Sequence, residues 1–142
     1  MKIALNLQNC TLRRVVWGSW LLCTTAILVI ARMLHPSPLG YGSHLQLGLP
    51  PCGFLIWSGM PCPSCGLTTS FAHLLHLQWI EAWHANPWGF FLLATLVLSV
   101  PVAAVGLLRA LPILATLEKL HTNKLILTLL GIGLLSWGLR LQ

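Results

Sequence analysis

Charge is what this sequence has least of. Only 7% of its 142 residues are charged, and the acidic ones are just Glu81 and Glu118. A water-soluble domain of this size carries about a quarter charged residues. Hydrophobic residues make up 56% of the chain and the mean hydropathy is +0.82. Too few polar side chains remain to cover a soluble surface, so the sequence predicts a single all-α membrane domain over residues 1–142.

The shortage of acids also excludes several kinds of active site. Glu81 and His84 have the Glu-x-x-His spacing of a carboxylate-bridged metal site, and His73 and His76 lie just before them. Such a site needs several more acidic ligands, although a haem between two of these histidines remains open. No Ser/His/Asp set, paired acids or phosphate-binding glycine loop can be assembled. The sequence therefore leans towards a protein that is not an enzyme, without deciding the point.

The net charge of +6 comes from eight Lys and Arg residues scattered at the ends of apolar runs. Nucleic-acid-binding proteins gather such residues into a patch or stripe, so nucleic acid is not an expected partner. The apolar runs predict three transmembrane helices at about 15–31, 88–108 and 122–139. The first is predicted to be an uncleaved anchor, because its run is long for a signal peptide and lacks a cleavage pattern.

Lysine and arginine are absent from the whole of 33–87. They precede the first span and recur between the second and third spans, in residues 109–124. By the positive-inside rule, the N-terminus and residues 109–124 are cytoplasmic, and 33–87 faces outward. Arg32 and Arg140 then lie at the outward ends of spans, against the rule.

The outward segment shows three patterns. Residues 35–42 are rich in proline and glycine and predict a connector without a helix. Residues 45–60 are apolar but interrupted, which favours an interfacial or re-entrant segment packed on the helices. Residues 67–83 regain helical periodicity and predict one amphipathic helix on the outer membrane surface. Asn86 and Pro87 then predict the N-cap and first residue of the second span.

A cysteine turn precedes that amphipathic helix. Cys62 and Cys65 form a C-x-x-C pair framed by prolines, with Cys52 ten residues earlier. The expected structural residues of the turn are Pro61, Pro63 and Gly66. The hydroxyl residues predicted to cap the following helix are Ser64, Thr68, Thr69 and Ser70.

Several chemistries fit three outward cysteines, and the sequence leaves them open. With His76 or His84 as a fourth ligand, the trio would form a Cys3His zinc site. An oxidising compartment favours a disulfide from Cys52 to Cys62 or Cys65, which leaves one thiol unpaired. Two further alternatives are thiols that simply pack and a redox dithiol at a helix N-terminus. No βαβ pattern, typical of such redox proteins, surrounds them.

The ordered motifs of this region carry a resemblance. They are Pro51-Cys52-Gly53-Phe54, Ser58-Gly59-Met60-Pro61-Cys62-Pro63-Ser64-Cys65-Gly66-Leu67-Thr68, Leu74-Leu75-His76 and Asn86-Pro87-Trp88. Together they resemble a family of small bacterial integral-membrane proteins of unknown function, over roughly residues 50–100. The resemblance implies a bacterial inner-membrane location and supplies no established activity. That family has arginine after the threonine of the block, where this chain has Thr69, so no cation is expected there.

Composition and motifs together favour a small scaffold or accessory subunit of a membrane complex. Few residues are suited to acid–base chemistry, and seven tryptophans offer anchoring surface to lipid or to a membrane-protein partner. The cysteine turn would make an outward platform rigid. The alternative is a metal-binding protein, with zinc or haem, or a thiol–disulfide redox protein that uses Cys52, Cys62 and Cys65.

Overall fold

The computed structural model describes residues 10–140, which contain helices and no strand. The elements are α1 (Cys10–Met33), η1 (Ser43–Leu47), α2 (Gly53–Ser58), α3 (Leu67–Leu75), α4 (Trp79–Ala85), α5 (Pro87–Arg109), α6 (Ile113–Lys119) and α7 (Thr122–Arg140). Three of them, α1, α5 and α7, are long and apolar enough to cross a membrane. The predicted all-α class with three spans is confirmed.

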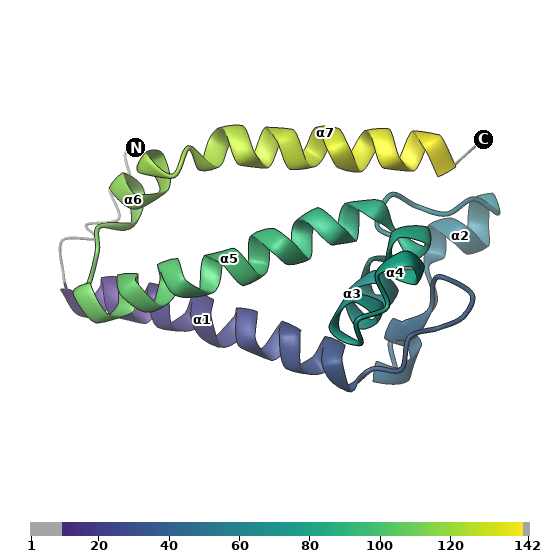
Figure 1. Cartoon of the computed structure of the whole chain (residues 1–142), viewed down its shortest axis with the longest axis horizontal. Helices are drawn as coiled ribbons and strands as arrows, with labels where there is room; N and C mark the ends of the chain where they lie inside the picture. The colour runs from purple at the N-terminus through teal and green to yellow at the C-terminus, as the bar shows by residue number, and fades with distance from the viewer. Residues whose placement is uncertain (1–9, 141–142) are drawn as a thin grey trace.

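The three long helices lie along one another, with α5 between α1 and α7 (Figure 1). The chain from the end of α1 to the start of α5 is gathered at one end of this bundle, where α7 also ends. Helix α6 lies at the opposite end. The predicted outward segment is therefore one structural unit at one end of the spans.

Helix α1 begins earlier than the predicted span. Its first turns include charged residues, which a hydropathy criterion leaves out of a span. Arg13 and Arg14 lie inside the helix, and arginine is a good helix former. The predicted start at residue 15 followed hydropathy, whereas the backbone stays helical beyond the apolar run. Helices α5 and α7 agree with their predicted spans to within a residue.

Helices α1 and α5 pack closely where Gly106 faces Trp17. A Cβ atom at Gly106 would lie 2.5 Å from the indole of Trp17, so only glycine leaves room for that ring. The Trp17 Nε1 atom donates a hydrogen bond to the carbonyl of Leu111, at 3.1 Å. Trp20 donates to Ser99 Oγ, also at 3.1 Å, one turn further along α1.

The single amphipathic helix predicted over 67–83 is wrong. The chain turns at Leu77, whose φ is +62°, and forms two short helices, α3 and α4. The carbonyl of His73 accepts hydrogen bonds from the amides of His76 and Gln78, which closes the turn. Helix α3 packs against α1, α4 and α5 and buries polar side chains that would face water on a surface helix.

The remaining connections differ from prediction in detail. Residues 35–42 contain no helix, as predicted, but 45–60 contain two short helical pieces, the end of η1 and α2. The cytoplasmic loop predicted over 109–124 contains α6. Each piece is under eight residues, too short for hydrophobic periodicity to reveal it in sequence.

Candidate metal centre at the cysteine turn

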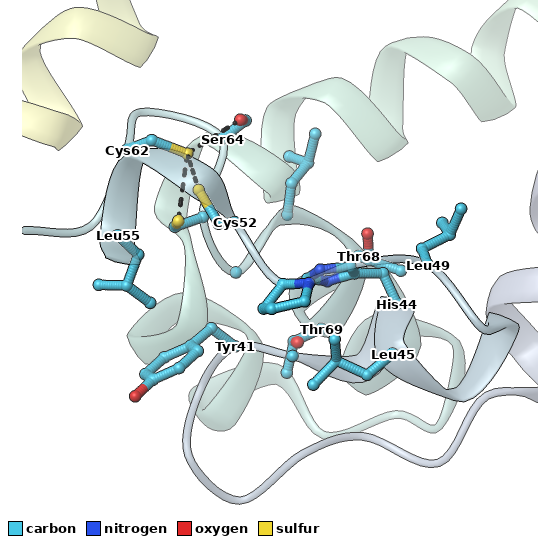
Figure 2. A pocket seen from close by; sticks show the side chains of 15 residues that line it. Tyr41, His44, Leu45, Leu49, Cys52, Leu55, Cys62, Ser64, Thr68 and Thr69 are labelled. Carbon is cyan, nitrogen blue, oxygen red and sulfur yellow. Dashed lines mark hydrogen bonds between the residues drawn. The ribbon is translucent and has the colours of Figure 1, made fainter. Parts of the chain in front are cut away.

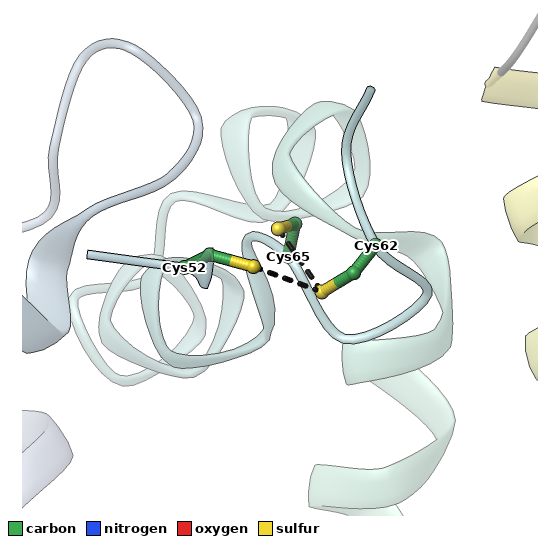
Figure 3. A group of neighbouring side chains, drawn as sticks. All are labelled: Cys52, Cys62 and Cys65. Atoms are coloured by element: carbon green, nitrogen blue, oxygen red, sulfur yellow. Dashed lines mark hydrogen bonds between the residues drawn. The ribbon is translucent and has the colours of Figure 1, made fainter. Parts of the chain in front are cut away.

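Three cysteines from two separate segments meet at one point (Figure 3). Cys52 lies immediately before α2, and Cys62 and Cys65 lie in the turn before α3. Their Sγ atoms are all within 4.8 Å of one another. The Sγ of Cys62 is 3.6 Å from that of Cys52 and 3.1 Å from that of Cys65.

These separations resemble those of ligands around one ion more than those of bonded sulfurs. Sulfurs in a disulfide are about 2.05 Å apart. Neighbouring thiolates around a tetrahedral zinc ion, with Zn–S bonds of about 2.3 Å, are about 3.8 Å apart. All three cysteines are free thiols in the structure. The donor set is thus suited to a thiophilic metal ion.

The two turn cysteines differ in acidity. Burial raises the pKa of Cys62, but hydrogen bonds with Ser64, Cys65 and Cys52 outweigh it and lower that pKa from 9.0 to about 7. Burial and the hydrogen bonds with Cys62 and Cys52 raise the pKa of Cys65 to about 12. Of these two thiols, Cys62 is therefore the one that ionises first as the pH rises.

Gly66 allows the turn to fold back into α3. Its φ is +83°, a left-handed conformation that L side chains rarely adopt. A Cβ atom there would lie 2.5 Å from the carbonyl oxygen of Ala85 and 2.6 Å from that of Gly40. The amide of Cys65 donates to the carbonyl of Cys62 at 3.0 Å, which closes the turn between the two thiols.

Asn86 joins the cysteine turn to the start of α5. Its Oδ1 accepts a hydrogen bond from the amide of Trp88, which confirms the predicted N-cap. Its Nδ2 donates to the carbonyls of Cys65, at 3.0 Å, and Pro63, at 3.3 Å. Asn86 is fully buried. A residue predicted only as a helix cap therefore also fixes the backbone of the cysteine turn.

Helix α7 reaches the same turn from the other end of the chain. Trp137 Nε1 donates to the carbonyl of Pro61 at 2.8 Å. The Arg140 guanidinium donates to the carbonyls of Cys65, at 3.0 Å, Pro63, at 3.1 Å, and Ala85, at 3.4 Å. Sequence reasoning missed Arg140, which is 75 residues from Cys65. The available signal was its position at the end of a span that the sequence predicts to be outward, against the positive-inside rule.

The structure does not bring His76 to the cysteines. Its Nδ1 is 2.8 Å from the carbonyl oxygen of Ala72, and its Nε2 is 2.9 Å from the guanidinium of Arg32. Both ring nitrogens are therefore engaged at the junction of α1 and α3. The alternative ligand, His84, lines a different cavity with His73 and Glu81.

The predicted capping role of Thr68 is wrong. The N-cap of α3 is Gly66, with no side-chain cap, and Thr68 lies inside the helix. Thr69, the residue at the arginine position of the resembling family, is fully buried. Its Oγ1 accepts a hydrogen bond from the amide of Ser43, at 3.3 Å. This position joins α3 to η1 and faces away from solvent.

A cavity of about 370 Å³ adjoins the cysteines (Figure 2). All three cysteines line it, and leucines form much of the remaining wall. Its polar lining includes His44, Tyr41 and Thr68, which Figure 2 shows across the cavity from the sulfurs. A small molecule in this cavity would therefore meet both an apolar wall and the thiol cluster.

Comparison with known proteins gives a match to a family model. Residues 52–100 match the model of a family described as a protein of unknown function, DUF2752. The matched stretch includes Cys52, Cys62, Cys65 and Asn86, but not Arg140. No curated protein and no solved structure matches the chain. Over about a third of its length, the chain is similar to a family of unknown function, as the motifs indicated.

Proposed function

We propose that this chain is a small non-catalytic membrane protein whose cysteine turn binds one zinc ion through Cys52, Cys62 and Cys65. The convergence of the three sulfurs carries the proposal. Side-chain packing alone does not require the three sulfurs to converge, and a disulfide would use only two of the three. Zinc prefers thiolate ligands, and the set supplies three of the four that a tetrahedral site takes.

The zinc ion would serve as a structural joint. The turn that carries two of its ligands already receives hydrogen bonds from Asn86, before α5, and from Trp137 and Arg140 of α7. A metal bound to Cys52 would add the segment before α2 to this junction. The metal would make this end of the helix bundle rigid, as zinc does in small structural sites. The protein would then act as a scaffold.

The fourth zinc position would be available to water or to a molecule in the cavity. The structure brings no fourth Cys, His or acidic ligand to the cluster among residues 10–140. Because all three cysteines line the cavity, an ion shared by them would border it.

The proposed setting is a bacterial inner membrane, with the cysteine end outward. The absence of Lys and Arg from 33–87 supports that orientation. At the same end, Trp57 is 87% exposed and Ile56 is 71% exposed on α2. These side chains would contact lipid or a membrane-protein partner, as exposed tryptophans do at interfaces.

Metal analysis of the detergent-purified protein tests the zinc proposal. We expect about one zinc per chain in the wild type, and loss of the metal in Cys52→Ser, Cys62→Ser and Cys65→Ser. Cys10→Ser and Cys23→Ser are matched controls, because both residues are exposed thiols outside the cluster. A chelator should lower the melting temperature, whereas a reductant should not.

Two other outcomes would contradict the zinc proposal. If a reductant lowers the melting temperature and non-reduced protein resists alkylation at two of the three cysteines, the turn holds a disulfide. If all three alkylate freely, no metal is present and the serine variants melt like the wild type, the cysteines only fill space.

A second candidate function is thiol–disulfide exchange, favoured by the unequal acidities of Cys62 and Cys65. The Cys62 thiolate would attack a substrate disulfide and release one substrate thiolate, and Cys65 would then displace the second, leaving a Cys62–Cys65 disulfide. Cys65→Ser should then trap a mixed disulfide at Cys62 with a disulfide-bonded peptide. Failure to trap one, together with zinc in the wild type, would exclude this alternative.

A further inference from the structure

Arg140 is a half-buried cation without an acidic partner among residues 10–140. Its NH1 and NH2 donate to the carbonyls of Cys65, Pro63 and Ala85. Its Nε is buried and has no hydrogen-bond partner. The acidic residues of the chain are only Glu81 and Glu118, and neither is bonded to it. Carbonyl oxygens solvate the guanidinium but do not cancel its charge.

A cation held away from water is unfavourable unless an anion lies close by. Two of the three carbonyls that Arg140 binds, those of Pro63 and Cys65, belong to the cysteine turn. Its charge therefore lies beside the turn that contains Cys62 and Cys65. A divalent ion bound to three thiolates has one net negative charge. One guanidinium beside it would make the assembly neutral, which suits a site at the end of a bundle of apolar helices.

We infer that Arg140 is the counter-ion of the proposed metal centre, supplied by the last turn of α7. The inference rests on the proposed function and assigns the centre a positioning residue outside its ligand set. It also gives Arg140 a reason to lie at a span end where the positive-inside rule disfavours it.

Two substitutions separate charge from hydrogen bonding. Arg140→Gln removes the charge and keeps amide donors, whereas Arg140→Lys keeps the charge and loses the planar pair of donors. Arg109→Gln is the control, because Arg109 ends α5 at the opposite end of the bundle. Each protein is stripped of metal and titrated with Co²⁺, whose thiolate charge-transfer absorption reports the ligand set. Zn²⁺ affinity is then measured by competition with a chromophoric chelator.

We expect Arg140→Gln to weaken Zn²⁺ binding by about 10–100-fold, the usual effect of removing a group that supports metal ligands. Arg140→Lys should retain most of the affinity, and Arg109→Gln all of it. Equal losses in Arg140→Lys and Arg140→Gln would show that Arg140 only braces the backbone, and unchanged affinity in both would also overturn the inference. Absence of thiolate–cobalt absorption in the wild type would overturn the metal centre, and the counter-ion with it.

Discussion

Cys62 is the cysteine of the cluster whose pKa the structure lowers. Its pKa is lowered from 9.0 to about 7, because hydrogen bonds with Ser64, Cys65 and Cys52 outweigh the effect of burial. A thiol reacts as the thiolate, so the pKa sets the pH at which alkylation accelerates.

In metal-free, reduced protein we expect the rate of Cys62 alkylation to rise with a midpoint near pH 7. A cysteine in an unstructured peptide, measured alongside, should have its midpoint near 8.5. Cys65 should react slowly throughout this range, because its pKa is raised to about 12. Iodoacetamide pulses followed by peptide mass spectrometry give each rate. A Cys62 midpoint equal to that of the peptide would contradict the hydrogen-bonded thiolate.

The sign of the linked stability follows from the same shift. A folded-state pKa below the ordinary value means that the thiolate of Cys62 stabilises the native state above about pH 9. That contribution is lost as the pH falls through about 7. Cys65 acts in the opposite sense, because its raised pKa disfavours its thiolate in the folded protein above about pH 9.

Residue types and spacing predicted part of the site. The C-x-x-C pair, Cys52 and the Asn86 cap were identified from short motifs whose geometry is local. The structure does not bring His76 to the cysteine cluster, and the sequence gives no sign that Arg32 lies against its ring. Thr68 was misassigned as a cap, because the left-handed Gly66 is itself the N-cap and α3 begins at the next residue.

Of the three spans, α7 has the fewest buried residues, which are Gly133 and Ser136. A Cβ atom at Gly133 would lie 2.8 Å from the indole of Trp88, whereas one at Gly131 would meet nothing within 4 Å. Helix α7 contains three glycines, Gly131, Gly133 and Gly138. Among residues 10–140, only Gly133 of the three lies against another helix.

Gly133→Ala should therefore destabilise the protein, and Gly131→Ala should not. The first forces Trp88 or α7 to move, at a cost of about 1–3 kcal/mol for an overpacked contact. The second removes a flexible residue from a helix, and gains about 0.5–1 kcal/mol. Thermal unfolding in one detergent compares the pair. Equal melting temperatures for the two variants would show that α7 is not seated on Trp88.

Element prediction succeeded where patterns were long and failed where they were short. The three spans were found because about 20 apolar residues are a strong signal. The break between α3 and α4 was missed because the apolar spacing continues through it. It depends on Leu77 adopting a positive φ, which a leucine rarely does and sequence does not reveal.

At the scale of the whole molecule, the structure places residues 34–86 at one end of the bundle and α6 at the other. Leu77 is 73% exposed at the first end, and Leu114 is 66% exposed on α6. With all five cysteines replaced by serine, Leu77→Cys and Leu114→Cys provide matched reporters. In intact cells, a membrane-impermeant maleimide should label only Leu77→Cys, and Leu114→Cys should be labelled after lysis. The reverse pattern would invert the proposed topology.

Global packing was the part least accessible to sequence reasoning. Hydropathy predicted the number of spans and the two segments that connect them. It did not predict that α7 ends against the cysteine turn, because contacts between residues 75 positions apart leave no periodic trace in a single sequence.

The distance along the chain between Cys65 and Arg140 has a consequence for biosynthesis. A membrane protein is made and inserted from its N-terminus. The three cysteines would therefore emerge two spans before the arginine that holds their turn. Until α7 is inserted, the thiols are present without Trp137 and Arg140, and are open to oxidation or to metal capture. The order of synthesis thus creates an interval in which the nascent chain depends on the redox state and metal supply of its surroundings.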